Sequence, residues 1–244
     1  MLYDSIGKTY TDVRREEPRI AARIRVALGD ARTVVNVGAG AGAYEPSDLD
    51  VTAVEPSETM IAQRPPGAAP VVRAFAEELP FEDQSFDAAM VVLSDHHWSD
   101  RERGLAELRR VARRVVLLSW DPSTVNDFWL VTEYLPCFAD LITKGFGLEQ
   151  IVEGLGGARM ERVPIPHDCL DGFFGAYWRR PQAYLDPHVR AGISACALMD
   201  GECLEEGVAR LAADLESGTW ERRHSDLLAL DELDLGYRLL IHPP

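Results

Sequence analysis

A run of branched apolar residues that ends in regularly spaced glycines constrains this chain more than any other feature. In the segment VVNVGAGAGAYEP, residues 34–46, the glycines occupy positions 38, 40 and 42. Glycine lets the backbone turn sharply and lets a ligand approach it closely. The segment therefore predicts a buried strand followed by a ligand-binding loop, as in sheets that bind nucleotides at their carboxyl edge.

Short apolar runs alternate with helical patterns through the first half of the chain. This alternation is typical of a parallel sheet that helices cover on both faces. We therefore predict an α/β fold with a doubly wound, mostly parallel, seven-stranded sheet. The expected strands are 33–37, 51–55, 69–75, 85–94, 114–120, 158–165 and 235–242, with helices at 19–28, 101–112 and 148–155.

The second half of the chain is rich in aromatic residues and helical patterns. Because the sheet is nearly complete by residue 120, the later segments are expected to add its far edge and a helical cap. We predict a single domain over 1–244, with an N-terminal lid at 1–18 and helical cap insertions at 123–147 and 167–234.

Charge excludes several classes of partner. The 244 residues carry 25 basic and 40 acidic side chains, a formal charge of −15. A nucleic-acid-binding surface needs a positive field, and an anionic membrane surface would repel this chain. No apolar run reaches the ~20 residues of a membrane span. We therefore expect neither nucleic acid nor membrane as a partner.

The cysteines and the N-terminal segment predict a cytoplasmic location. The segment MLYDSIGKTY lacks the basic and apolar regions of a signal peptide. Cys137, Cys169, Cys196 and Cys203 are widely spaced and form no CxxC pair. In a chain of this length they are expected to be reduced thiols rather than a disulfide framework.

The residues of the glycine loop leave two cofactor classes open. Gly38, Gly40 and Ala43 fit the dinucleotide pattern GxGxxG/A, which permits a nicotinamide-dependent oxidoreductase. The pyrophosphate of such a cofactor needs a helix N-terminus, but Pro46 and the acidic residues around it leave little room for a helix. Glu55, at the end of the second strand, is placed to accept from both hydroxyls of a ribose. The loop thus suits a ligand with an adenosine end and a positively charged centre.

Four segments in order resemble class I S-adenosylmethionine-dependent methyltransferases, in the group that acts on small molecules and quinones. They are VVNVGAGAG, VTAVEPSETM, AEELPFEDQSFDAAMVVLSDHHW and LAELRRVARRVVLLSW, which span about residues 30–120. The resemblance implies S-adenosyl-L-methionine as cofactor and S-adenosyl-L-homocysteine as product. The segment after residue 123 matches the general family poorly.

The resemblance also implies a cofactor site. Glu55 would hold the ribose hydroxyls, while Phe75 stands where the family often has an acid, so adenine recognition there is expected to use stacking and backbone groups. Tyr10 and Arg14, on the lid, are candidates for the methionine carboxylate. The implied cofactor-binding set is Gly38, Ala39, Gly40, Glu55, Pro56, Met60, Phe75, Ala76, Glu77, Ser94, Tyr10 and Arg14.

Two adjacent histidines follow the fourth strand. In a doubly wound sheet this edge borders the crevice where ligands bind. The unperturbed pKa of histidine, roughly 6.5, suits proton removal near neutral pH. His97 and His96 are therefore the candidate catalytic residues, either as a base or as contacts to the methyl acceptor. Neighbouring histidines do not converge on one ion, so we expect no metal.

The acceptor pocket is expected beneath the cap. Large rings suit a pocket for apolar or aromatic small molecules, although the same rings would also build a cap core. The candidate pocket residues are Trp98, Trp120, Phe128, Trp129 and Tyr177.

Taken together, these patterns predict an enzyme that moves a methyl group from S-adenosylmethionine to a small, apolar or aromatic metabolite by in-line displacement. The alternatives are an NAD(P)-dependent oxidoreductase, or a methyltransferase-fold protein with non-methyl chemistry or binding only. The sequence leaves open the acceptor, the methylated atom and the oligomeric state.

Overall fold

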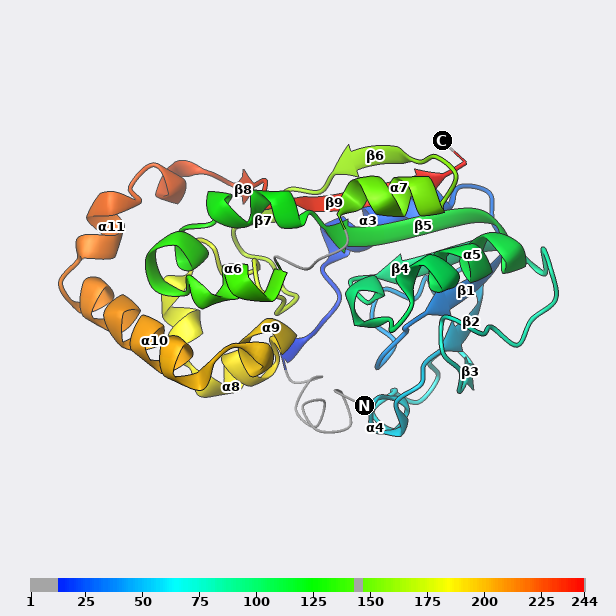
Figure 1. Ribbon diagram of the computed structural model, residues 1–244, viewed down its shortest axis with the longest axis horizontal. Coiled ribbons are helices and arrows are strands. Elements are labelled where there is room, and N and C mark those ends of the chain that lie inside the picture. The colour runs from blue at the N-terminus through cyan, green and yellow to red at the C-terminus, as the bar shows by residue number, and fades with distance from the viewer. Residues whose placement is uncertain (1–12, 143–146, 244) are drawn as a thin grey trace.

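The computed structural model describes residues 13–142 and 147–243, which form a sheet-based half and a helical half (Figure 1). The main sheet has seven strands in the order β3-β2-β1-β4-β5-β9-β6. The pairs β3–β2, β2–β1, β1–β4 and β4–β5 are parallel, whereas β9 runs antiparallel to both β5 and β6. The prediction of a mostly parallel seven-stranded sheet is confirmed.

The elements follow the predicted order along the chain. The strands are β1 (Thr33–Val37), β2 (Asp50–Val54), β3 (Val71–Val72), β4 (Phe86–Val92), β5 (Ala112–Trp120), β6 (Arg159–Arg162), β7 (Ile165–Pro166), β8 (Glu232–Leu233) and β9 (Tyr237–His242). The helices are α3 (Pro18–Leu28), α4 (Glu58–Ala62), α5 (Arg101–Val111), α6 (Cys137–Ile142), α7 (Leu148–Gly154), α8 (Pro187–Ala191), α9 (Ser194–Leu198), α10 (Gly201–Glu216) and α11 (Thr219–Arg223).

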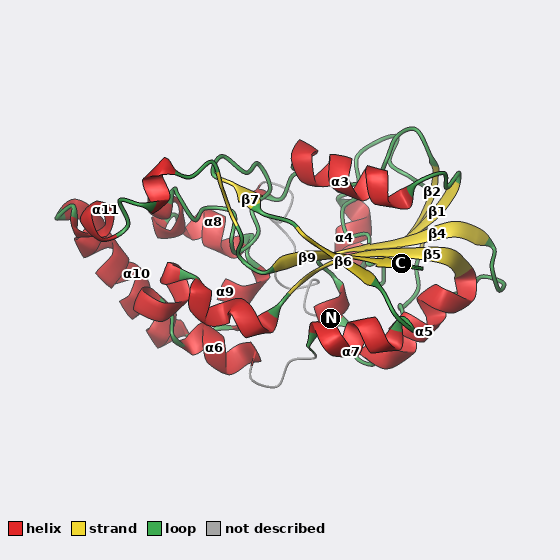
Figure 2. Cartoon of the chain, turned by 90° about the horizontal axis from the view of Figure 1, so that it is seen from above, coloured by secondary structure: helices red, strands yellow, loops and turns green. Residues whose placement is uncertain are grey.

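Helices cover both faces of the sheet, with α3 on one side and α5 and α7 on the other (Figure 2). Successive strand residues point to opposite faces, so Val34 joins the core cluster that contains Ile24 of α3, whereas Val35 joins the cluster that contains Leu105 of α5. All four side chains are buried. This two-sided burial explains why the strands are apolar throughout instead of alternating with polar residues.

Local signals set the limits of α3, which leads into β1. Pro18 occupies the first turn, where its missing N–H costs nothing, and the Glu17 side chain accepts a hydrogen bond from the Arg19 N–H. The helix ends at Gly29, whose φ of 63° is unfavourable for residues with a Cβ. The observed limits agree with the helix predicted at 19–28, to within one residue at its start.

The helical half contains α6 and α8 to α11 and lies beyond one end of the sheet (Figure 1). Its centre is aromatic: the Trp129 ring packs at 5.2 Å from Trp220 and 6.0 Å from Tyr184, measured between ring centroids. A two-stranded ribbon of β7 and β8, which the sequence patterns did not indicate, joins this half to the sheet. The predicted helical part of the C-terminal half is therefore present, and we call it the cap.

One prediction about the cysteines is wrong. Cys137 of α6 and Cys203 of α10 form a disulfide, while Cys169 and Cys196 are free and buried. The two bonded residues are 66 positions apart in sequence, yet their Cα atoms lie 6.4 Å apart. Sequence spacing carries no sign of this pairing, because it arises only when the cap helices pack together.

We expect this disulfide to stabilise the cap. Closing a loop of 66 residues restricts the unfolded chain and contributes about 4 kcal/mol to the free energy of unfolding in the chain-entropy model. Thermal melts should show a lower melting temperature for Cys203→Ser, and for the wild type in dithiothreitol. A Cys137→Ser/Cys203→Ser variant serves as the control, since dithiothreitol should leave its melting temperature unchanged. A wild type that is insensitive to the reductant would contradict this expectation.

Candidate active site

The glycine loop follows β1 in a backbone conformation that a side chain would obstruct. Gly38 has a φ of +72°, and a Cβ there would come within 2.4 Å of Ser94 Oγ. The backbone N–H groups of Gly38 and Ala39 both donate to the carbonyl of Val54, at distances of 2.9 and 3.0 Å. The turn therefore needs glycine at position 38 both for its dihedral angle and for the close approach of β4.

No helix lies between β1 and β2 in the structure, where every residue is described. One acidic residue of this loop, Glu45, pairs with Arg64 at 2.8 Å, and both side chains are less than 10% exposed. Arg64 also donates to the carbonyl of Gly40 at 3.2 Å. This buried ion pair thus holds the glycine loop in place. Because no helix follows the glycines, the loop has no helix N-terminus that could bind a pyrophosphate.

Glu55 lies directly after β2, beside the glycine loop. One carboxylate oxygen accepts from the Gly40 N–H at 2.8 Å and the other from the Ser57 N–H at 2.9 Å. The residue is 6% exposed and lines a cavity. Two backbone donors thus hold the carboxylate in place at the wall of that cavity, and a carboxylate is an acceptor that suits hydroxyl donors.

That cavity, which we call the glycine-loop cavity, has a volume of about 490 Å³. It gathers residues from the ends of β1, β2 and β4 and from the turns after β3 and β4. Every residue of the implied cofactor set that the structure describes lines it: Arg14, Gly38, Ala39, Gly40, Glu55, Pro56, Met60, Phe75, Ala76, Glu77 and Ser94. Tyr10 lies outside the described residues.

Phe75 and Glu77 occupy the turn after β3 and differ in their environment. Phe75 is 54% exposed, so its ring lines the cavity and does not belong to the core. Glu77 accepts from the N–H groups of Ser99 and Asp100 at 2.7 and 3.1 Å. Burial raises the pKa of Glu77, but these hydrogen bonds outweigh it and hold the pKa below its ordinary value. The Glu77 carboxylate is thus hydrogen-bonded to the backbone directly before α5.

Arg14 lines this cavity and pairs with Asp171, an acidic residue of the cap. Its Nε donates to Asp171 Oδ1 at 2.6 Å and its Nη2 donates to Oδ2 at 3.2 Å. The hydroxyl of Tyr44, in the glycine loop, donates to the same Oδ2 at 2.8 Å. Asp171 is 1% exposed. One buried carboxylate therefore joins the segment before α3, the glycine loop and the cap.

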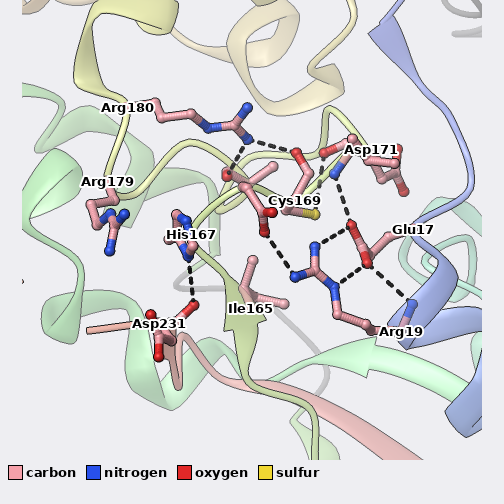
Figure 3. Close-up of polar contacts among 12 residues, drawn as sticks. Glu17, Arg19, Ile165, His167, Cys169, Asp171, Arg179, Arg180 and Asp231 are labelled. Carbon is pink, nitrogen blue, oxygen red and sulfur yellow. Dashed lines mark hydrogen bonds and ion pairs between the residues drawn. The ribbon is translucent and has the colours of Figure 1, made fainter. Parts of the chain in front are cut away.

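The cap loop around Asp171 is held by further polar contacts (Figure 3). Glu17, which caps α3, also accepts from the Leu170 N–H at 2.9 Å. From the other side, Arg180 donates to the Cys169 carbonyl at 2.6 Å. Because these contacts come from both the sheet and the cap, the loop keeps Asp171 at the boundary between them.

His96 and His97 lie in a one-turn 3₁₀ segment, Asp95–His97, after β4. His97 is half-buried, whereas His96 is exposed, and both residues line cavities of the structure. Desolvation lowers the pKa of His96 to about 4 and that of His97 to about 3, helped by the Arg101 charge near His96 and by His96 near His97. Both imidazoles are therefore neutral at pH 7 and are weak proton acceptors.

A second cavity, of about 720 Å³, adjoins the first beneath the cap, and we call it the cap cavity. The two cavities share wall residues at their boundary: Arg14, Leu93, His96, His97, Trp98 and Ser99. Of the predicted pocket residues, Trp98 and Trp120 line the cap cavity. The other three, Phe128, Trp129 and Tyr177, line neither cavity. Phe128 and Trp129 are buried in the cap core because their rings pack against other rings of the cap.

The sequence patterns missed most of the cap-cavity wall. Phe173 and Phe174 were part of a recognisable aromatic stretch, but nothing in the sequence separates rings that line a cavity from rings that fill a core. Other missed residues include Asp95, Ser119, Phe138, Ile193, Leu198 and Tyr237. Within the described ranges, no three His, Cys, Asp or Glu side chains come together in a way that could hold a metal ion.

Comparison with known proteins decides the family. A family model described as a methyltransferase domain matches residues 35–118. The crystal structure of a proposed methyltransferase from an antibiotic biosynthesis pathway of Anabaena variabilis is 32% identical, covers 94% of this chain and 98% of its own, and superposes with a TM-score of 0.87. The chain belongs to the class I S-adenosylmethionine-dependent methyltransferases.

Two further proteins show how far the similarity extends in sequence and in fold. A ubiquinone/menaquinone biosynthesis C-methyltransferase of Geobacter is 26% identical in an alignment of 175 residues that covers 64% of this chain and 69% of that protein. The [4+2]-cyclase SpnF shares the fold over 98% of this chain with a TM-score of 0.54 at 15% identity. The second likeness concerns the fold alone.

The glycine-loop cavity fits the cofactor of this family. Position 38 has no room for a Cβ beside Ser94, and the Glu55 carboxylate lies directly after β2. The cavity wall also includes the apolar side chains of Met60 and Phe75. Each of these features suits one part of a nucleoside with a thioether tail. The nicotinamide alternative is not supported, since no helix begins at the glycines to receive a pyrophosphate.

Glu55→Ala should weaken the binding of S-adenosylhomocysteine. The substitution removes a charged acceptor for the ribose hydroxyls, and hydrogen bonds to charged groups contribute roughly 1.5–3 kcal/mol, so calorimetry should show roughly 10- to 100-fold lower affinity. Glu58→Ala is the matched control, because Glu58 is 73% exposed on the neighbouring helix and does not line the cavity. Equal affinity of the two variants would remove Glu55 from the cofactor site.

The lowered pKa values of His96 and His97 predict an acid-sensitive fold. Their folded pKa values, about 4 and about 3, lie below the unfolded value, which is roughly 6.5. The unfolded chain therefore binds more protons at these residues, and stability falls as the pH drops from about 6.5 towards 4. In urea titrations, His97→Asn should lose less stability over this window than the wild type. An identical pH dependence would contradict the lowered pKa of His97.

Proposed function

We propose that this methyltransferase transfers a methyl group to a small, apolar or aromatic metabolite held in the cap cavity. The observation that supports this most directly is the shared wall between the two cavities, formed in part by His96, His97 and Trp98. A cofactor in one cavity and an acceptor in the other would meet at that wall. The cap side adds the rings of Trp120, Phe138 and others, which favour an apolar acceptor.

The chain's own part in this reaction is mainly positioning. When bound, S-adenosylmethionine supplies an activated methyl group on a sulfonium sulfur for in-line displacement. Gly38, Gly40 and Glu55 would hold the cofactor, and the cap would hold the acceptor in line with it and exclude water. We propose that His96 and His97 contact the acceptor at the boundary. Their lowered pKa values favour hydrogen bonding over the removal of a proton.

Other parts of the proposal concern partners, location and organisation. The charge of −15 supports a small molecule rather than a nucleic acid as acceptor. None of the described helices is long and apolar enough to cross a membrane. A cytoplasmic location stays a prediction, and the Cys137–Cys203 disulfide removes the part of it that rested on reduced thiols. The domain limits, with a lid at 1–18 and cap insertions at 123–147 and 167–234, likewise stay predictions.

Methyl transfer to a panel of aromatic alcohols, amines and carbon acids tests the proposed function. We expect label from methyl-labelled S-adenosylmethionine to appear on at least one of them. Ala195→Phe should raise the KM for that acceptor several-fold and leave the affinity for S-adenosylhomocysteine unchanged, because Ala195 lines only the cap cavity.

Ala197→Phe is the matched control on the same helix, since Ala197 is exposed and lines neither cavity. It should keep the wild-type KM. An enzyme that binds the cofactor but labels no compound of the panel would contradict the proposed acceptor class. Equal effects of the two substitutions would contradict the cap cavity as the acceptor site.

A further inference from the structure

The wall of the cap cavity contains a buried carboxyl group that the proposed function does not use. Asp95 precedes the two histidines and is 1% exposed. Its Oδ1 accepts a hydrogen bond from the hydroxyl of Ser119 at 3.0 Å. Within the described part of the chain, its Oδ2 has no hydrogen-bond donor, and the nearest ion-pair partner, Arg101 Nε, lies 3.6 Å away. A buried carboxyl with one unsatisfied oxygen is costly, which indicates a function for it.

The fold brings Asp95 and Ser119 together from neighbouring strands. Asp95 follows β4 and Ser119 is the penultimate residue of β5, which pairs with β4 in parallel register. Both residues line the cap cavity and neither lines the glycine-loop cavity. They therefore lie on the acceptor side of the boundary, at the carboxyl edge of the sheet, where ligands bind in this class of fold.

The direction of the hydrogen bond determines what this pair offers a ligand. The Ser119 hydroxyl donates its proton to Asp95, so its oxygen lone pairs remain able to accept a proton from another group. A carboxylate behind a hydroxyl also increases the negative charge on that hydroxyl oxygen. The pair thus presents a hydrogen-bond acceptor backed by a negative charge, in a cavity whose other walls are largely apolar.

We propose that Ser119 is a catalytic residue that accepts the proton of a hydroxyl-bearing aromatic acceptor, and that Asp95 is its positioning residue and final proton acceptor. This inference rests on the proposed function and names its substrate class. The acceptor's O–H proton passes to Ser119 Oγ as the Ser119 proton passes to Asp95 Oδ1. The freed electron pair on the acceptor forms the bond to the methyl carbon, and the carbon–sulfur bond breaks with its electron pair left on sulfur.

The electrostatic surroundings support this assignment. Burial raises the pKa of Asp95, and this outweighs the opposing effects of Arg101, Ser119 and His97. The pKa values of the neighbouring histidines move the other way, to about 4 and about 3. A proton acceptor works best when its pKa approaches the working pH, so the raised pKa of Asp95 favours a role in accepting a proton.

The test compares 2-naphthol with naphthalene as probes of the enzyme loaded with S-adenosylhomocysteine. The two probes share their apolar body, so the ratio of their affinities isolates the hydroxyl contact from changes in packing. Calorimetry should show that the wild type binds 2-naphthol about tenfold more tightly, which corresponds to a hydrogen bond with a charge-backed acceptor. Ser119→Thr should keep this preference because it keeps the hydroxyl.

Ser119→Ala should abolish the preference, and Asp95→Asn should reduce it because an amide removes the negative charge behind Ser119. Equal affinities of the wild type for both probes, no binding of 2-naphthol, or an unchanged preference in Ser119→Ala would overturn the proposal. The affinity for S-adenosylhomocysteine should be the same in all variants, which shows that each is folded. Failure of the wild type to bind it would instead contradict the proposed function.

Discussion

The carboxylate of Asp171 is buried where the cap meets the sheet, and it accepts hydrogen bonds from Arg14 and Tyr44. These partners belong to the segment before α3 and to the glycine loop, so one side chain holds together three parts of the chain that are far apart in sequence. A buried charge is stable only when it is paired and hydrogen-bonded. Asp171 can therefore stay buried only while the cap stays against the glycine loop.

Several other acids of this strongly acidic chain also organise its loops. Glu45 braces the glycine loop through Arg64, Glu55 accepts from two backbone N–H groups beside it, and Glu77 accepts from the N–H groups at the start of α5. Hydrogen bonds with an ionised partner are about twice as strong as neutral ones. These acids thus hold the loops around the cofactor site in place.

The position of the two cavities explains how a sheet of this kind supports methyl transfer. The sheet supplies the cofactor side through the ends of β1, β2 and β4, while the cap supplies most of the apolar wall on the other side. The 3₁₀ turn after β4 belongs to both cavities, and it carries His96 and His97. In the proposed function, the two reactants would be brought into line at this boundary, and such positioning contributes much of the rate when the methyl donor is already activated.

Local patterns made much of the sheet half predictable. The apolar repeat and caps of α3 and the apolar run of β1 act within a few residues, so sequence alone reveals them. The glycines and Glu55 were recognisable for the same reason, because their roles depend on their place after a strand. Even here β3 is only Val71–Val72, shorter than predicted, since an edge strand pairs on one side only.

The arrangement of side chains in the cap could not be predicted from the sequence, because it depends on packing between distant segments. Trp120 and Trp129 carry the same type of ring, yet one lines a cavity and the other fills a core. The pairing of Cys137 with Cys203 and of Asp95 with Ser119 likewise follows from contacts that no spacing encodes. The sequence by itself therefore determined the sheet and the glycine loop, because short-range patterns specify them, and the order of four motifs along the chain indicated the cofactor class. Only the tertiary structure decided which side chains line the cap cavity, because that choice depends on how the cap packs against the sheet.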